Sequence, residues 1–489
     1  MGNNYKTLAC LSCLIIGMIF TSFTINAQDV FEEWQKQQQK EMQKFKDEQD
    51  REFMDFLEKE WKEFQVFHGL IADETPKPIK VPVADSIPHK QFPDTTIIKD
   101  IKIPIPLPQR EVELKDTLIS PDAMRGKLLH FTFYDVPLLI SYDEGFEEIV
   151  STDISEKAIA SFWETISNSE YESCFKQARN YKEQMRLNDW GYCQLLYEIG
   201  KVIFQDSKNY ANLFIWFMLT KSGYEARVGY NEKEVYLLLP SEQIFYNLPY
   251  FTSENKNIYV ISFDIKITSI GSLFTYDGNY PGADKLITLM IYKSPNIKDN
   301  IIKKEFKFIY RETEFTINAK YNKYTVDFFK KYPHTNYEVY FNAPLSPVAY
   351  SSLITELKPI LQGKSEAEAV NILLRFIQTA FDYKTDDEQF GEEKCLFADE
   401  TIFYPYSDCE DRSVLFAYLV KKILGLEVIG LDYPGHVATA IKFHTDIDGD
   451  YIVFQDNKYI VCDPTYINAD VGMCMPEFKN VIPEIIQLQ

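Results

Sequence analysis

The stretch from Asp408 to Val420 constrains the fold more than any other part of the chain. Asp408 is a good helix N-cap residue, and the apolar run behind it has helical spacing. The helix would begin at Cys409, where free backbone N–H groups and the helix dipole favour a thiolate over a thiol. The sequence therefore predicts a reactive cysteine in the first turn of a helix.

Two further residues follow this helix at equal intervals. The spacing from Cys409 to His436 is the same as the spacing from His436 to Asp463. The intervening pattern predicts an antiparallel meander of strands over 437–443, 451–454 and 458–462. His436 would start the first strand and Asp463 would end the third. A thiol, an imidazole and a carboxylate in this order are the parts of a nucleophile, its base and the group that orients the base.

Three segments carry a resemblance to a known family. They are DCEDRSVLFAYLV around Cys409, YPGHVATAI around His436 and YIVCDPTYINADVG around Asp463. Together they resemble the transglutaminase-like superfamily of cysteine enzymes, over roughly 350–480. The resemblance implies a papain-like α+β fold, in which a helix that bears the cysteine packs on an antiparallel sheet. It also implies that Cys409 is the nucleophile, His436 the base and Asp463 the residue that orients the base.

The same resemblance sets an expectation for the activity. The superfamily contains protein cross-linking enzymes, proteases and amidases, together with members that have lost activity. We therefore expect a thioester acyl-enzyme formed on a protein or peptide substrate, with either water or an amine as the acyl acceptor and without a cofactor. The competing interpretation is a non-catalytic binding or scaffold protein of the cell envelope, in which the triad is a relic.

An earlier stretch can be laid over the Cys409 segment at one constant offset, without a gap. The matched apolar segments are Leu213 to Phe217 with Leu415 to Leu419, and Ser222 to Glu225 with Leu424 to Glu427. Ser207 takes the place of Cys409, and Glu234 takes the place of His436. We infer a degenerate transglutaminase-like module over 111–264, although any two helix–turn–strand units share part of such a pattern.

The segment 1–27 is typical of an export signal. Lys6 supplies a positive charge, 8–23 is largely apolar, and Ala27 is a small residue at the end. Cys10 loosely fits a lipid-attachment motif, but it precedes most of the apolar run, which is the wrong place. We therefore expect an exported protein, located in the periplasm, at the cell surface or outside the cell.

Residues 28–70 predict a long amphipathic helix of the coiled-coil type. Large apolar residues recur there every eleven positions, and eleven residues make three helical turns, so they form one narrow stripe. The two rows of the stripe are Phe31, Met42, Phe53 and Phe64, and Trp34, Phe45, Phe56 and Phe67. We expect the stripe over 30–68 to pack on the protein's own body or to self-associate. A membrane surface and an unknown partner remain alternatives.

The rest of the chain divides by composition. At 489 residues it is too long for one core. Residues 71–110 are rich in proline and predict an extended linker. The block 255–343 predicts a sandwich or an extended sheet, hence a β-rich domain at 265–349, and the catalytic domain would occupy 350–489.

Charge and spacing exclude several classes of protein. The net charge of −22 argues against a nucleic-acid partner. The histidines lack zinc-ligand spacing, and the acidic turn at 446–450 lacks the glycine position of an EF-hand, so no metal is expected. The six cysteines after the leader are too few for a disulfide framework, and most of them, Cys462 included, should be buried.

Three features near Cys409 complete the expected site. Asp411 and Arg412 should brace the helix against the sheet rather than touch the substrate. The loop from Asp386 to Tyr406 has no evident counterpart in the earlier copy. We expect this loop to form one wall of the cleft and to supply any side-chain donor to an oxyanion.

Overall fold

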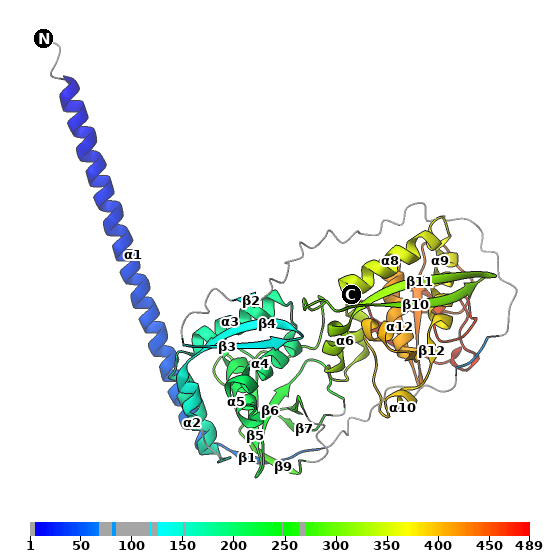
Figure 1. Ribbon diagram of the computed structural model, residues 1–489, viewed down its shortest axis with the longest axis horizontal. Coiled ribbons are helices and arrows are strands. Elements are labelled where there is room, and N and C mark those ends of the chain that lie inside the picture. Colours follow the sequence, from blue (N-terminus) through cyan, green and yellow to red (C-terminus); the bar gives the residue numbers. More distant parts are fainter. Residues whose placement is uncertain are drawn as a thin grey trace.

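The computed structural model describes residues 5–67, 81–84, 118–119, 126–149, 153–246, 248–264 and 270–489, with side chains from Val30 onward except at 118–119. The chain is mixed α and β, 41% helical and 26% strand, with sheets packed against helices (Figure 1). This is the α+β class expected from the sequence.

A single long helix forms the N-terminal end. Helix α1 (Tyr5–Leu57) projects from the body, and only its last turns lie against the rest of the chain (Figure 1). There Lys221 Nζ pairs with Asp50, and the Phe53 ring meets Trp163 at 4.7 Å between centroids. The earlier part of the stripe is exposed by more than half at Phe31, Trp34, Met42 and Phe45. Among the residues whose side chains are described, no helix is both long and apolar enough to cross a membrane.

The helix expected over 28–70 ends earlier, at Leu57. After a turn, β1 (Lys62–Gln65) pairs antiparallel with β9 (Ser272–Thr275). Phe64 contacts Phe251 at 4.8 Å between ring centroids, and Val66 joins the apolar cluster on that face of the sheet. Tertiary packing therefore overrides helical propensity in this segment.

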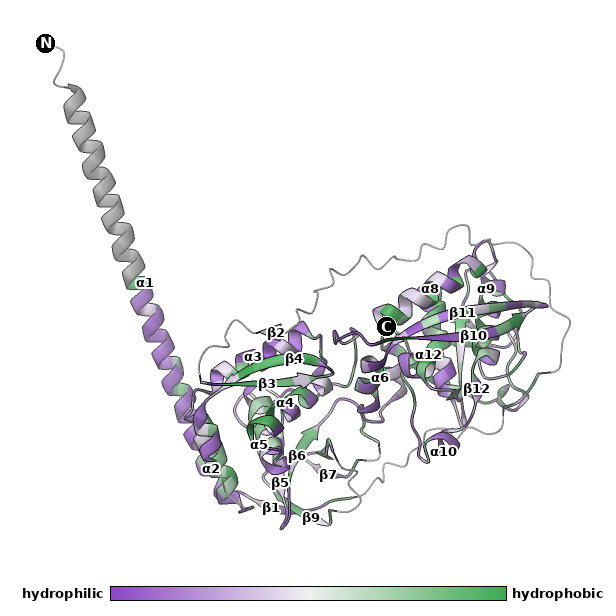
Figure 2. Cartoon of the chain, viewed as in Figure 1, coloured by the Kyte–Doolittle hydropathy of each residue, from purple (hydrophilic) through white to green (hydrophobic). Residues whose placement is uncertain are grey.

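The described part of the N-terminal half contains a three-stranded sheet, several helices and a six-stranded sheet. Its elements in chain order are β2 (Leu118–Ile119), β3 (Lys127–Phe133), β4 (Val136–Tyr142), η1 (Glu144–Glu148), α2 (Glu156–Ser167), α3 (Tyr171–Gln184), α4 (Asp189–Ile203), α5 (Lys208–Lys221), β5 (Arg227–Tyr230), β6 (Val235–Pro240), β7 (Tyr250–Ser253) and β8 (Lys256–Ile261). The three-stranded sheet has the order β2-β4-β3, and the six-stranded sheet has the order β1-β9-β5-β6-β8-β7. Helix α5 is mostly apolar and buried in this half, whereas α1 from Val30 onward is largely polar (Figure 2).

The C-terminal half follows a similar plan. Its elements are β10 (Ile301–Tyr310), β11 (Thr313–Asn322), α6 (Lys323–Lys330), α7 (Tyr337–Asn342), α8 (Pro347–Leu361), α9 (Glu366–Ala380), β12 (Asp382–Tyr383), α10 (Asp386–Gln389), α11 (Ala398–Phe403), β13 (Tyr406–Ser407), α12 (Cys409–Leu419), the π-helical turn η2 (Val420–Leu424), β14 (Glu427–Tyr433), β15 (His436–Lys442), β16 (Tyr451–Phe454), β17 (Asn457–Cys462), η3 (Pro476–Phe478) and β18 (Glu484–Gln487). The sheet order is β16-β17-β15-β14-β18, and α12 packs against β15.

The two halves share topology and register. The order β5-β6-β8-β7 reappears as β14-β15-β17-β16. In the first half Arg227 lies opposite Leu238, and in the second half Ile429 lies opposite Ala440. Each residue of the second pair follows its counterpart in the first by the same number of positions as Cys409 follows Ser207. In each half a hairpin also precedes the helices: α3 packs on β4 as α8 packs on β11, and α4 packs on β3 as α9 packs on β10. This agreement is the main structural support for a duplicated unit.

Among the described residues of 255–343, the expected sandwich or extended sheet is not found. Strand β9 belongs to the N-terminal sheet, 276–300 contributes only isolated bridges, and α6 and α7 are helical. The strongly β-like sequence forms the hairpin β10–β11, whose buried side chains include Phe306 and Phe308. Helices α8 and α9 pack on this hairpin, so it is part of the C-terminal half rather than of a domain at 265–349.

Most of the proline-rich linker expected at 71–110 lies outside the described residues. The described part, 81–84, runs beside the loop that follows Asp463. The Ala84 N–H donates to the Ile467 carbonyl at 2.8 Å, and the Ile467 N–H donates to the Pro82 carbonyl at 3.2 Å. Ala84 is buried there with Tyr466 and Met475.

Candidate active site

The cysteine helix begins where the sequence predicts. Asp408 occupies the N-cap of α12, Cys409 is the first helical residue, and every side chain of the helix is buried. Arg412 donates to Ser407 Oγ at 3.1 Å and to the carbonyls of Gln378 and Phe381 at 3.3 and 2.7 Å. Asp411 accepts from the Leu396 N–H at 2.7 Å. Both residues thus brace α12, but they tie it to the end of α9 and to the preceding loop, not to the sheet as the sequence predicts.

The strands are not joined as a simple meander. Strand β17 lies between β15 and β16, so β16 is at the edge of the sheet. This order matters because neighbouring strands are about 4.8 Å apart and alternate strands about twice that distance. Since β17 pairs directly with β15, with Cys462 opposite Thr439, the residues at their ends are close enough to form a hydrogen bond.

His436 and Asp463 form that hydrogen bond. His436 Nε2 lies 2.8 Å from Asp463 Oδ2, and both side chains are buried. The other carboxylate oxygen of Asp463 accepts from the N–H groups of Thr465 at 2.8 Å and Tyr466 at 3.1 Å. Burial lowers the pKa of the His436 imidazole, but the charge and hydrogen bond of Asp463 outweigh it, so the pKa is raised above its ordinary value.

The thiol of Cys409 lies beside this pair but is bonded elsewhere. It donates to Glu410 Oε2 at 3.1 Å and accepts from the Val437 N–H at 3.5 Å. Among the described residues no hydrogen bond joins it to His436 itself. The side chain is fully buried, at 0% exposure. The expectation of a thiolate therefore fails, because burial, Glu410 and Asp408 raise the pKa of the Cys409 thiol well above its ordinary value, against the helix dipole.

Two supporting residues were missed by sequence reasoning. Gln378 Nε2 donates to the carbonyls of Asp463, Tyr466 and Ala469 at 3.1, 2.9 and 3.0 Å, which fixes the loop that carries the acid. Phe478 stacks on the His436 ring, with centroids 5.2 Å apart. Gln378 left a detectable signal, because it follows Asn371 by seven residues, so that two polar side chains share one face of a largely apolar helix. Phe478 left no such signal in the sequence, because it lies in a loop beyond the segment around Asp463, outside the three recognised motifs.

The loop from Asp386 to Tyr406 is an insertion between α9 and α12. In the N-terminal half only a short turn separates α4 from α5. The rings of Phe390 and Tyr404 contact each other at 5.1 Å, and Lys394 lies over both. Asp386 reaches the start of α12, near Asp408 and Glu410, as Leu396 of the same loop does through Asp411. The expected oxyanion donor from this loop stays a prediction.

The corresponding positions of the N-terminal half carry no such constellation. Ser207 is the N-cap residue of α5 and is partly exposed. Glu234 is exposed and accepts from the Tyr236 hydroxyl at 3.0 Å. Because the β7–β8 hairpin is displaced by one position relative to β16–β17, Ser262 stands where Asp463 does.

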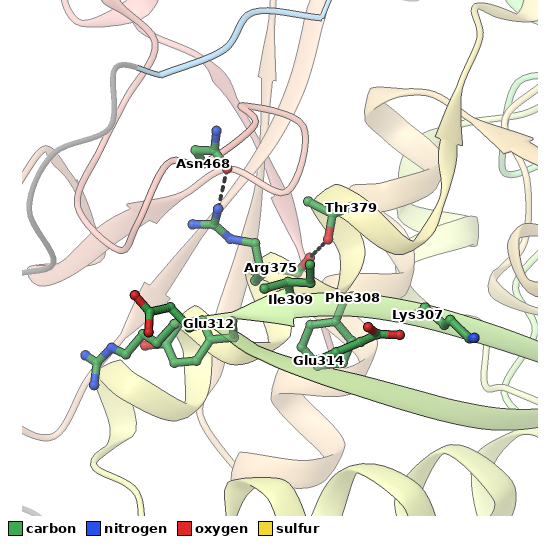
Figure 3. Close-up of a pocket in the computed structure, with 10 residues that line it drawn as sticks. Lys307, Phe308, Ile309, Glu312, Glu314, Arg375, Thr379 and Asn468 are labelled. Atoms are coloured by element: carbon green, nitrogen blue, oxygen red, sulfur yellow. Dashed lines mark hydrogen bonds between the residues drawn. The ribbon is translucent and has the colours of Figure 1, made fainter.

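A separate pocket of about 960 Å³ lies at the tip of the β10–β11 hairpin (Figure 3). Its lining residues are Lys307, Phe308, Ile309, Tyr310, Arg311, Glu312, Glu314, Arg375, Thr379 and Asn468. Arg375 reaches across it to Asn468. No residue of the triad lines this pocket, although Asn468 belongs to the loop after Asp463.

The six described cysteines, Cys174, Cys193, Cys395, Cys409, Cys462 and Cys474, are all free and buried, as expected for small apolar side chains. No protein-family model, no curated protein and no solved structure matches this chain.

Proposed function

We propose that this protein is an exported, transglutaminase-like thiol enzyme that acts on amide or peptide bonds of a protein or peptide substrate. The observation that carries the proposal is the convergence of three distant residues at one buried place. His436 is paired with Asp463 at 2.8 Å, and the Cys409 thiol accepts from the amide next to His436. A thiol, an imidazole and an orienting carboxylate are the parts required for nucleophilic acyl transfer.

The proposed reaction begins when the thiol leaves Glu410 and turns to His436. The imidazole takes the thiol proton as sulfur attacks the carbonyl carbon, and Asp463 stabilises the resulting imidazolium. The Cys409 N–H, which as the first residue of α12 has no intrahelical acceptor, donates to the oxyanion. The imidazolium then protonates the leaving amine, and the C–N bond breaks to give a thioester. Water or a second amine resolves the thioester to an acid or to a new amide.

In this proposal both halves have the papain-like fold, and the catalytic residues belong to the C-terminal half alone. The N-terminal half is a degenerate copy without a nucleophile, base and acid. The aromatic stripe of α1 beyond its docked end offers a surface for self-association or for a partner.

A second candidate is a binding or scaffold protein with a relic triad. The observation that favours it is the buried thiol, which bonds to Glu410 rather than to His436. The pocket at the hairpin tip would then be a candidate binding surface.

Trapping of the acyl-enzyme separates the two candidates. The full chain is incubated with extracellular and cell-envelope proteins, and thioester adducts are identified by mass spectrometry. The enzyme predicts an adduct on Cys409 that is absent from Cys409→Ala and present in Cys474→Ala, which removes another buried thiol. Two results together would support the scaffold. The wild type would form no adduct on Cys409, and a thiol-directed electrophile would label the wild type and Cys409→Ala equally.

A further inference from the structure

Three buried carboxyl groups meet beside Cys409. Asp386, Asp408 and Glu410 each place one carboxylate oxygen within 4.8 Å of the other two. Their side chains are at most 2% exposed. Asp386 comes from the inserted loop, whereas the other two belong to the start of α12. The chain therefore brings acids from distant segments together in a dry part of the molecule.

The ionisable side chains that act most strongly on Asp408 are other acids, Glu410, Asp411 and Asp386. Both of its carboxylate oxygens are buried without a hydrogen bond to the described residues. A buried carboxylate oxygen without a donor is costly, so such atoms are normally satisfied by a hydrogen bond or an ion. Asp386 uses one oxygen to accept from the Lys394 N–H at 2.6 Å, and Glu410 uses one to accept from Cys409. Each of the three acids thus keeps at least one oxygen available.

The neighbouring cations are engaged elsewhere. Lys394 pairs with Glu400 at 2.9 Å, and His436 pairs with Asp463. The guanidinium of Arg412 donates to a hydroxyl and two carbonyls rather than to a carboxylate. No ion pair connects Asp386, Asp408 or Glu410 to a basic side chain in the described parts of the chain. The partial charge at a helix N-terminus, about half a unit, is too small to balance three carboxylates.

We infer that Asp386, Asp408 and Glu410 form a binding site for one divalent cation with a preference for oxygen ligands. Carboxylate oxygens suit Ca²⁺, Mg²⁺ and Mn²⁺. Two oxygens on opposite sides of Ca²⁺ are about 4.6 to 5.2 Å apart, so one such ion spans the observed cluster. The bound ion would hold the inserted loop against the first turn of α12.

The site is specific to the C-terminal half. The N-terminal half has no inserted loop and hence no equivalent of Asp386. The residue at the position of Glu410 is Lys208, which cannot ligate a cation. Sequence spacing does not reveal the site because Asp386 is far from the other two acids along the chain. The inference does not depend on the proposed thiol chemistry.

Calorimetric titration tests the inference on the full chain. The protein is stripped with a chelator and titrated separately with Ca²⁺, Mg²⁺ and Mn²⁺, and with Zn²⁺ for comparison, and the thermal unfolding midpoint is measured with and without each ion. We expect one saturable site per chain, a raised midpoint, and an affinity at least about tenfold lower in Asp386→Asn. The matched control is Asp387→Asn, which changes the exposed neighbour and should bind as the wild type does.

Several outcomes would overturn the inference. One is a stripped wild type that binds none of the three ions, which would mean that the carboxyl groups are balanced by shared protons. Another is equal affinity in Asp386→Asn and Asp387→Asn. A third is a preference for Zn²⁺ that is lost in Cys409→Ala, which would make the thiol a ligand. If Asp386→Asn does not fold without metal, Glu410→Gln replaces it, with the same expected loss.

Discussion

At the scale of single residues, the base and its acid are held more firmly than the nucleophile. Asp463 accepts from His436 and from two backbone N–H groups, so its orientation is fixed from three sides. The Cys409 thiol instead bonds to the Glu410 side chain, away from His436. A small rotation is needed before attack, which a catalytic site without a bound substrate can accommodate.

Asp463→Asn tests the role of the acid without removing its backbone contacts. The amide oxygen can still accept from Thr465 and Tyr466, so we expect a change in unfolding temperature that is small compared with that of Asp463→Ala. The side-chain amide cannot stabilise an imidazolium, so acyl-enzyme formation should fall by about 10³- to 10⁴-fold. Rapid-quench measurement of the thioester gives the rate. A rate close to that of the wild type would remove Asp463 from the mechanism.

The pair also predicts a pH dependence of stability. Because the pKa of His436 is raised in the folded state, the folded protein holds this proton more tightly than the unfolded chain. The stabilisation is fully present below the unfolded pKa of about 6.5 and is lost as pH rises through the folded pKa. Urea unfolding should therefore show that the advantage of wild type over His436→Gln shrinks as pH rises above about 6.5.

The Asp463→Asn background supplies the control for this titration. In this background the carboxylate no longer offsets the desolvation of His436, so the pKa of the imidazole is no longer raised. The loss of unfolding free energy caused by His436→Gln should then not be larger at low pH than at high pH. If the loss of unfolding free energy caused by His436→Gln grows with pH in the wild-type background, the pKa of His436 is not raised in the folded state.

At the scale of elements, local patterns predicted most of what forms the site. The helix starts at Cys409, and β16 spans Tyr451–Phe454, as the sequence indicates. The order of the strands was wrong, because alternation identifies a strand but does not specify its neighbour. The end of α1 was also wrong, because Phe64 and Phe67 continue the eleven-residue period while their backbone pairs with other strands. In both cases a contact distant in sequence decided the outcome.

The docked end of α1 gives a prediction with a matched control in the same stripe. Phe53 is 5% exposed and lies against Trp163 and Tyr280, so Phe53→Ala should lower the free energy of unfolding by about 3–5 kcal/mol. Phe45 is 57% exposed, and Phe45→Ala should stay within about 0.5 kcal/mol of the wild type. Denaturant unfolding measures the free energy of unfolding of both variants. Equal losses would mean that α1 packs on the rest of the chain at Phe45 as well as at Phe53.

At the scale of the whole molecule, one topology appears twice with different chemistry. The strand register is repeated at a constant offset, yet the residues at the Cys409 and His436 positions are Ser207 and Glu234. The second half also carries the insertion between α9 and α12, which contributes Asp386 and holds Asp411 through Leu396. The scaffold alone therefore does not supply a reactive site.

This contrast predicts that a thiol added to the first half will not become a nucleophile for acyl transfer. In a Cys409→Ala background, Ser207→Cys should restore no thioester adduct, because the equivalent of His436 is an exposed carboxylate and no inserted loop encloses the position. Alkylation by a small electrophile should still occur, since Ser207 is partly exposed, and this shows that the new thiol is accessible. A thioester adduct at position 207 would mean that the shared topology itself activates the thiol, so that the triad, the insertion and the acids around Cys409 are dispensable.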